Sequence, residues 1–275
     1  MKVDLHTHSH FSDGTLSPAD VVRRAFESGM RLMVLTDHDC VAGYEQARAQ
    51  GEQLGMKVLC GVEINTQKDD IHVLGYGIEW LSPAFIGRLA EFRGRREKRI
   101  RAIVERLRQA SIDISWEEVQ NAAALDRGQA VGRPHVADAL RRKKIVRSRR
   151  EAFQKFLSHG KSAFVDPMGP TAEEAIAAIR EAGGTPVIAH PGSLFDLDRF
   201  RSWADVGLGG IEIYYPTHTH TAVLELLQIA RMLNLMPTGG SDFHGPGTGR
   251  DKLTGFDPDD ELWSRLAPAL ERGRA

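Results

Sequence analysis

The first strand-like segment of the chain carries a high density of imidazole and carboxylate groups. Within DLHTHSHFSDG (4–14), His6 and His8 lie two positions apart and Asp13 follows in the next loop. Side chains two apart on an extended strand point to the same face, so His6 and His8 are expected to act together. Imidazole and carboxylate groups that share one face bind metal ions or transfer protons.

Further apolar segments carry the same side-chain types at or near their ends. These residues are Asp37 and His38 (segment 31–38), Glu63 (57–65), His72 (71–78), His190 (185–190), Glu212 and His218 (within and after 207–215), and Asp242 and His244 (at and after the end of 235–242). One histidine on an apolar strand is usually a core residue, but seven such coincidences indicate one shared site. The mixed ligands suit Zn, Mn or Fe, and their number predicts two or three ions. A carboxylate such as Glu63 can bridge two ions, an arrangement typical of phosphate-ester hydrolysis.

The elements that must position these residues are strands that alternate with helical patterns. One helix is expected to begin at Ser17-Pro18, and another, after the second strand, to end at Gly55. Further helices are expected over 171–183, 194–205, 219–233 and 260–272. Such alternation implies an α/β fold with a parallel sheet, helices outside it and the site at the carboxyl ends of the strands. Seven strands fit an incomplete (β/α) barrel or a doubly wound open sheet, and we expect the barrel. The fourth strand follows the third after a short polar turn at 68–70.

A long helical segment interrupts the alternation between the fourth and fifth strands. We therefore divide the chain into a barrel of residues 1–80 and 164–275 and a helical insertion of residues 81–163. Residues 82–163 hold 20 Lys/Arg against 9 Asp/Glu, whereas the remainder holds 16 against 28. The acid-rich part can hold metal cations and the basic part can receive an anionic substrate, although solvated helix faces would also explain the arginines.

The composition suits a folded protein, and a reducing cytoplasm is the expected compartment. The chain has 275 residues, is 41% hydrophobic, and has two cysteines, Cys40 and Cys60, that form no disulfide framework. No apolar run reaches the roughly 18 residues of a membrane span, so no membrane association is expected. The sequence shows no pattern that requires an obligate protein partner.

The motifs DLHTHSHFSDG, TDHD, GVEI, AHPG and GSDFHG resemble, in order, those of the PHP (polymerase and histidinol phosphatase) family of metal-dependent phosphoesterases. The resemblance implies a distorted (β/α)7 barrel with three divalent ions, most readily Mn, with Zn or Fe as alternatives. It implies three ligand sets: His6, His8, Glu63 and Asp242; Glu63, His72 and His190; and Asp13, His38 and His244. Relatives often have histidine where this chain has Asp13, which gives that set a harder, oxygen-preferring character.

Within the family the chain resembles the small bacterial branch that removes the 3'-phosphate from nucleoside 3',5'-bisphosphates, giving a nucleoside 5'-monophosphate and phosphate. Close relatives degrade short 5'-phosphorylated oligonucleotides, so a 5'-3' exonuclease is one alternative. Histidinol phosphatase is another, but its cationic substrate suits an arginine-rich insertion poorly. A non-catalytic metal- or nucleotide-binding module is a third, and no ligand is missing to support it.

The substrate-binding residues are predicted from local features. Gly132-Arg133-Pro134-His135 begins a helix in the insertion, where Arg133 and His135 are expected to hold a phosphate. His218 is expected to reach the reacting phosphoryl group, and Asp37 is expected to orient the ligand beside it. Ordinary exposed side chains would also account for Arg133, His135 and His218.

Overall fold

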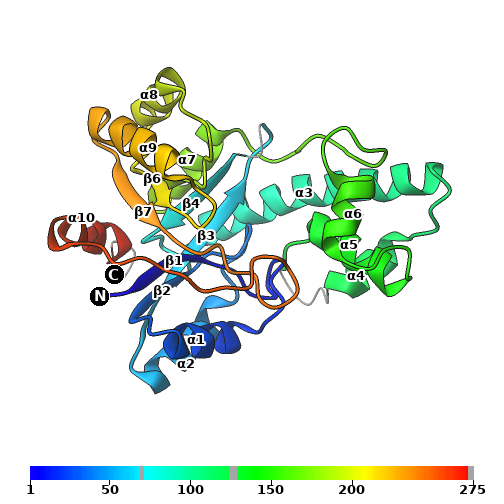
Figure 1. The fold of residues 1–275 in the computed structure, drawn as a ribbon, viewed down its shortest axis with the longest axis horizontal. Coiled ribbons are helices and arrows are strands. Elements are labelled where there is room, and N and C mark those ends of the chain that lie inside the picture. Colours follow the sequence, from blue (N-terminus) through cyan, green and yellow to red (C-terminus); the bar gives the residue numbers. More distant parts are fainter. Residues whose placement is uncertain (69–70, 124–128, 272–275) are drawn as a thin grey trace.

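The computed structural model describes residues 1–68, 71–123 and 129–271, which form a barrel and a helical insertion (Figure 1). The strands of the barrel are β1 (Val3–Thr7), β2 (Leu32–Leu35), β3 (Lys57–Asn65), β4 (His72–Tyr76), β5 (Thr185–Ala189), β6 (Gly210–Tyr214) and β7 (Met236–Gly239). They form one seven-stranded sheet in sequence order within the described residues. The amide of His8 donates to the carbonyl of Phe243 at 2.8 Å, which joins β1 to the segment after β7. The sheet is therefore nearly closed, as the predicted barrel requires.

The expectation of a fully parallel sheet is wrong for β4. This strand runs antiparallel to both β3 and β5, whereas the other paired neighbours are parallel. Only a short connection, of which residues 69–70 lie outside the described residues, joins β3 to β4, and a parallel crossover needs a dozen or more residues. His72 is the first residue of β4. Because β4 is antiparallel to β3, His72 lies directly opposite Asn65 at the end of β3. His72 thus reaches the same end of the barrel as the other predicted ligands.

Helices cover the outside of the barrel: α1 (Pro18–Glu27), α2 (Tyr44–Leu54), α7 (Ala172–Glu181), α8 (Leu197–Asp205) and α9 (His220–Met232). Their starts follow local capping chemistry, since Ser17 accepts from the amide of Asp20 and Thr171 forms a capping box with Glu174. Buried side chains of these helices pack against outward-facing residues of the sheet. A further helix, α10 (Asp260–Glu271), packs with Val3, Leu5 and other strand residues at the barrel end opposite the insertion (Figure 1).

Two irregularities interrupt the regular pairing of the strands. The register between β1 and β2 shifts between Asp4 and Thr7, and the register between β6 and β7 shifts between Glu212 and Tyr214. A bulge bends its strand and changes the direction of nearby side chains, and bulges are common beside active sites. Both shifts border imidazole or carboxylate residues of the candidate site.

The insertion comprises α3 (Pro83–Gln109), α4 (Trp116–Ala123), α5 (Arg133–Arg142), α6 (Arg149–Ala152) and the π-helix η1 (Phe153–Leu157). The first half of α3 packs on the barrel core through Phe85, Leu89 and Phe92. Its second half belongs to a separate apolar cluster with residues of α4, α5 and η1. Figure 1 shows α4, α5 and α6 grouped at the far end of α3, which connects them to the barrel.

Candidate metal centre

The predicted ligands converge at one end of the barrel. Four groups of nitrogen and oxygen atoms each lie within 4.8 Å of one another: His8, Asp13, His38 and His244; His6, His8, Glu63 and Asp242; Glu63, His72 and His190; and His6, His190 and Glu212. The structure thus brings together all nine side chains that the sequence indicated as ligands, in groups that contain the three predicted sets. Most of them are buried, with His72 and His190 partly exposed.

Glu63 lies at the centre of this arrangement. Its Oε2 is 3.1 Å from His6 Nε2, 3.0 Å from His8 Nε2 and 3.2 Å from His38 Nδ1. Its Oε1 is 2.7 Å from His72 Nδ1 and 3.1 Å from His190 Nε2. A carboxylate with imidazoles around both oxygens has the placement that a bridging ligand needs.

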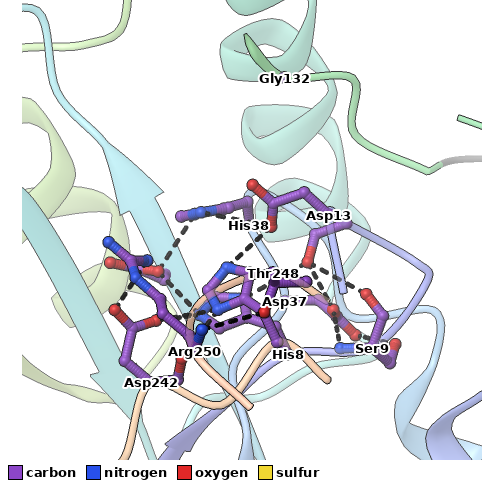
Figure 2. Close-up of polar contacts among 12 residues, drawn as sticks. His8, Ser9, Asp13, Asp37, His38, Gly132, Asp242, Thr248 and Arg250 are labelled. Carbon is purple, nitrogen blue, oxygen red and sulfur yellow. Dashed lines mark hydrogen bonds and ion pairs between the residues drawn. The ribbon is translucent and has the colours of Figure 1, made fainter. Parts of the chain in front are cut away.

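Two aspartates complete the clusters. Asp242 Oδ1 lies 3.4 Å from His8 Nε2 and 3.3 Å from His244 Nδ1, and Asp13 Oδ1 lies 3.1 Å from His244 Nε2. Figure 2 shows Asp242 with Arg250 on one side of His8, and Asp13 with Ser9 and Asp37 on the other. The site therefore extends across the barrel end rather than occupying a single point.

The donor set fits a group of divalent metal ions. Asp13 Oδ1, His38 Nδ1, Glu63 Oε2 and Asp242 Oδ1 are buried and make no hydrogen bond. Buried polar atoms normally have partners, so four unsatisfied atoms within one cluster indicate a ligand that the protein alone does not supply. Nitrogen and oxygen donors without thiolates are typical of Zn, Mn and Fe sites.

Hydrogen bonds behind the imidazoles fix their orientation. His6 Nδ1 donates to Glu212 at 2.9 Å, and His244 Nδ1 donates to the backbone carbonyl of Asp242 at 2.8 Å. His8 Nδ1 lies 3.3 Å from the Ser12 hydroxyl, whose oxygen is 2.6 Å from Asp37. In each case Nε2 remains directed toward the carboxylates. Metal-binding histidines commonly have such a partner on the other ring nitrogen.

Burial and charge act in opposite directions on the cluster. Burial disfavours the imidazolium form of His6, but Glu212, Glu63 and Asp242 outweigh it and raise the pKa of His6 well above its ordinary value. Burial likewise disfavours ionised Glu63, but His38 and the surrounding imidazoles lower the pKa of this carboxyl well below its ordinary value. The cluster therefore keeps its carboxylates ionised, as metal ligands must be.

Strained backbone marks three of the strand ends. Asp39 after β2, His190 after β5 and Asp242 after β7 have positive φ angles of 48°, 27° and 53°. Residues other than glycine adopt this region at a cost and do so mainly at functional sites. Two of these residues, His190 and Asp242, are predicted ligands, and Asp39 directly follows the predicted ligand His38.

The hydrogen bonds of the Asp37 carboxylate go to other residues than His38, the ligand that it was expected to orient. It accepts hydrogen bonds from the Ser9 amide at 2.8 Å and from the hydroxyls of Ser9 and Ser12, each at 2.6 Å. Because consecutive residues at a strand end point in opposite directions, Asp37 turns toward the loop of β1 instead. Its effect on the cluster passes through Ser12 to His8.

The predicted substrate residues occupy different surroundings. Arg133 lines the cavity described below, whereas His135 is buried and its Nδ1 accepts from the Gly132 amide at 2.9 Å. Burial lowers the pKa of His135 to about 4. His218 donates from Nδ1 to the Ile213 carbonyl and accepts at Nε2 from the Gly192 amide, so it fixes the turn that follows His190.

A cavity of about 280 Å³ lies between the cluster and the insertion. Its lining includes Asp13, His38, His72 and His244 from the cluster. Five arginines also line it: Arg96, Arg99, Arg133, Arg149 and Arg250. A second cavity of about 320 Å³ shares His72, Arg133 and Arg250 with the first and also borders His190. Metal-binding groups and clustered guanidinium groups together suit a substrate with more than one phosphate.

Sequence reasoning did not identify Arg250 or Tyr215 as residues of the site. Arg250 Nη1 lies 2.8 Å from Asp242 Oδ2, and the Tyr215 hydroxyl donates to the same oxygen at 2.9 Å. Glu212, which the sequence already singled out within the sixth strand, lies behind His6. No comparable signal marked Arg250, which follows a glycine-rich loop.

Comparison with known proteins agrees with this geometry. The protein-family model described as PHP domain matches residues 4–104 of the sequence. The chain is 35% identical over 253 residues to the 5'-3' exoribonuclease Rnm of Salmonella typhimurium, which covers 88% of this chain and 85% of that protein. It is 33% identical over 255 residues to the 3',5'-nucleoside bisphosphate phosphatase of Chromobacterium violaceum, with 90% and 88% covered.

A solved structure from Bifidobacterium adolescentis, assigned as a metal-dependent phosphoesterase, superposes with a TM-score of 0.89 at 31% identity. The superposition covers 98% of this chain and 96% of that one. No helix among the described residues is long and apolar enough to cross a membrane. By its sequence, its barrel and its cluster of histidines and carboxylates, this chain belongs to the PHP family of metal-dependent phosphoesterases.

Proposed function

We propose that the protein removes the 3'-phosphate from nucleoside 3',5'-bisphosphates, such as adenosine 3',5'-bisphosphate, and releases a nucleoside 5'-monophosphate and phosphate. The observation that carries the proposal is the cavity whose lining combines the candidate metal centre with five arginines. A substrate with two phosphates can place one at the cluster and the other among the guanidinium groups. The similarity to a bisphosphate phosphatase over 90% of the chain supports this substrate class.

For the cofactor we propose three divalent ions, with Mn as the first choice and Zn or Fe as alternatives. The first would be held by His6, His8, Glu63 and Asp242, the second by Glu63, His72 and His190, and the third by Asp13, His38 and His244. Divalent ions at these positions would lower the pKa of a water molecule and neutralise negative charge on the phosphoryl oxygens. The residues proposed for the first ion, His6, His8, Glu63 and Asp242, are the least exposed of these ligands.

The residues of the chain would bind and orient the substrate. Arg133 and Arg250 line both cavities beside His72, so they can hold the phosphoryl group that reacts. Arg96 and Arg99 lie in the lining of the first cavity, where they can hold the 5'-phosphate. Oriented guanidinium groups in a confined site stabilise phosphoryl charge and restrict the substrate to a reactive geometry.

We assign positioning roles to the other predicted substrate residues. Asp37 would keep the Ser9–Ser12 loop and His8 in place, and His218 would keep the turn after His190 in place. His135 would fix the start of α5 through the Gly132 amide, so that Arg133 faces the cavity. Residues 81–163 would then act as a capping subdomain over the cluster. The unpaired cysteines Cys40 and Cys60 support a reducing cytoplasm as the compartment.

The test is phosphate release by the Mn-loaded protein from three substrates: adenosine 3',5'-bisphosphate, a 5'-phosphorylated dinucleotide and histidinol phosphate. The proposal predicts the highest kcat/KM for the bisphosphate. Preference for the dinucleotide would favour the 5'-3' exonuclease, which the similarity to Rnm keeps as the second candidate. Preference for histidinol phosphate would refute both, because the arginine-lined cavity opposes a cationic substrate.

A further inference from the structure

The insertion contacts the loop that carries Asp13 at two backbone carbonyls. Arg149 Nη1 donates to the carbonyl of Asp13 at 3.0 Å. The amide of Ala130 donates to the carbonyl of Phe11 in the same loop at 3.1 Å. Residues more than a hundred positions away in the chain therefore determine where this short loop lies.

Arg149 is itself held from its other edge by Asp138. Its Nε lies 3.1 Å from both carboxylate oxygens of Asp138, and its Nη2 lies 2.6 Å from Oδ2. Both residues are buried, with exposed fractions of 9% and 7%. Because the planar guanidinium uses one edge for the carboxylate and another nitrogen for the carbonyl, its direction is fixed in a way that a lysine would not reproduce.

The opposite side of the loop is fixed by the barrel. Asp37 binds Ser9 and Ser12, and the amide of Gly14 donates to the carbonyl of Ser9 at 3.0 Å. The Asp13 carbonyl is then the point at which Arg149 acts on the loop. The carboxylate on the same residue faces His244 at 3.1 Å and His38 at 3.7 Å.

We propose that Asp138 and Arg149 are positioning residues for the ion held by Asp13, His38 and His244, so that binding of this ion depends on the insertion. The inference rests on the proposed function, which supplies the ion. A partner that orients a metal ligand typically contributes 10- to 100-fold to metal affinity. Asp138 acts only through Arg149 in this scheme, and it does not line the arginine-rich cavity.

The test measures Mn²⁺ binding to the full-length chain by equilibrium dialysis, without substrate, for wild type, Asp138→Asn, Arg149→Lys and the double variant. We expect one ion to bind about 10- to 100-fold more weakly in each variant, with the other ions unchanged. The double variant should lose no more than Arg149→Lys alone, because the two residues act in series. Asp13→Asn provides the reference for loss of the same ion.

Val136→Ala is the matched control. Val136 is a fully buried residue of α5, and its truncation loosens the apolar cluster of the insertion without removing a charge or a hydrogen-bonding group. The control should unfold at a lower temperature and keep wild-type Mn²⁺ affinity. The inference is overturned if folded Asp138→Asn and Arg149→Lys bind every ion as wild type does, or if Val136→Ala weakens the same ion equally. A wild-type chain that binds no Mn²⁺ overturns the proposed function and the inference with it.

Discussion

Glu212 offers a quantitative test of how the site orients its histidines. Its buried carboxylate accepts from His6 Nδ1 at 2.9 Å and from the His190 amide at 2.8 Å. In Glu212→Gln the side chain keeps its shape, but one of its two oxygens becomes an NH₂ group. Either His6 Nδ1 or the His190 amide must then face this NH₂ group, because glutamine has a single acceptor oxygen.

The expected loss follows from these two contacts. A hydrogen bond to a charged group contributes about 1.5–3 kcal/mol, and the variant loses one such bond and weakens the other. An orienting partner of a metal ligand accounts for about 10- to 100-fold in affinity. At about 1.4 kcal/mol per factor of ten, this loss of affinity corresponds to about 1.4–3 kcal/mol of weaker ion binding.

The assay is titration of the metal-free protein with Mn²⁺, in which the electron paramagnetic resonance signal of free Mn²⁺ reports the unbound ion. Glu225→Gln, an exposed change on the helix that follows β6, is the control and should bind as wild type does. Wild-type affinity in folded Glu212→Gln would refute the orienting role. An equal loss in Glu225→Gln would show that net charge, and not the contact with His6, is responsible.

Three further changes probe other parts of the site. A Cβ on Gly240 would lie 2.4 Å from His6 Cβ, so Gly240→Ala should displace His6. The variant should lose about 1–3 kcal/mol of unfolding free energy and bind less Mn. An unchanged Mn content and an unchanged melting temperature would contradict this. Arg250→Lys keeps the charge but loses the fork beside Asp242, so kcat/KM for the bisphosphate should fall about tenfold with unfolding free energy changed by less than about 1 kcal/mol. For His135, with a pKa of about 4 when folded and about 6.5 when unfolded, stability is full above pH 6.5 and falls as the pH drops toward 4. Urea unfolding in a chelator should therefore show wild type losing about 3 kcal/mol relative to His135→Gln between pH 7 and pH 4, whereas parallel curves would contradict the assignment.

The metal cluster was predictable because its residues follow the ends of strands. The carboxyl ends of neighbouring parallel strands meet at one edge, so the strand positions of His38, Glu63 and Asp242 were sufficient to bring them together. Direction was predicted wrongly for β4, where alternation of strands and helices fails and the connection is too short for a crossover. His72 still joined the cluster because it begins a reversed strand.

The arginine-lined cavity was not predictable in the same way. Arg96 and Arg99 lie on a long helix whose polar residues resemble a solvated face, and only the packing of α3 on the barrel turns them toward the cluster. Arg250 follows Gly245, Gly247 and Gly249, which all have positive φ angles, and periodicity carries no information about the path of such a loop. The contact of Arg149 with Asp13 joins residues distant in sequence and depends on tertiary packing.

The most direct test of the central account is anomalous X-ray scattering from crystals grown with Mn²⁺. Three peaks are expected, one in each proposed ligand set: His6, His8, Glu63 and Asp242; Glu63, His72 and His190; and Asp13, His38 and His244. Glu63 should lie between the first two peaks. Peaks at the first two sets alone would contradict the role proposed for Asp13. The absence of any peak among these histidines and carboxylates in a protein that still hydrolyses the bisphosphate would contradict the account as a whole.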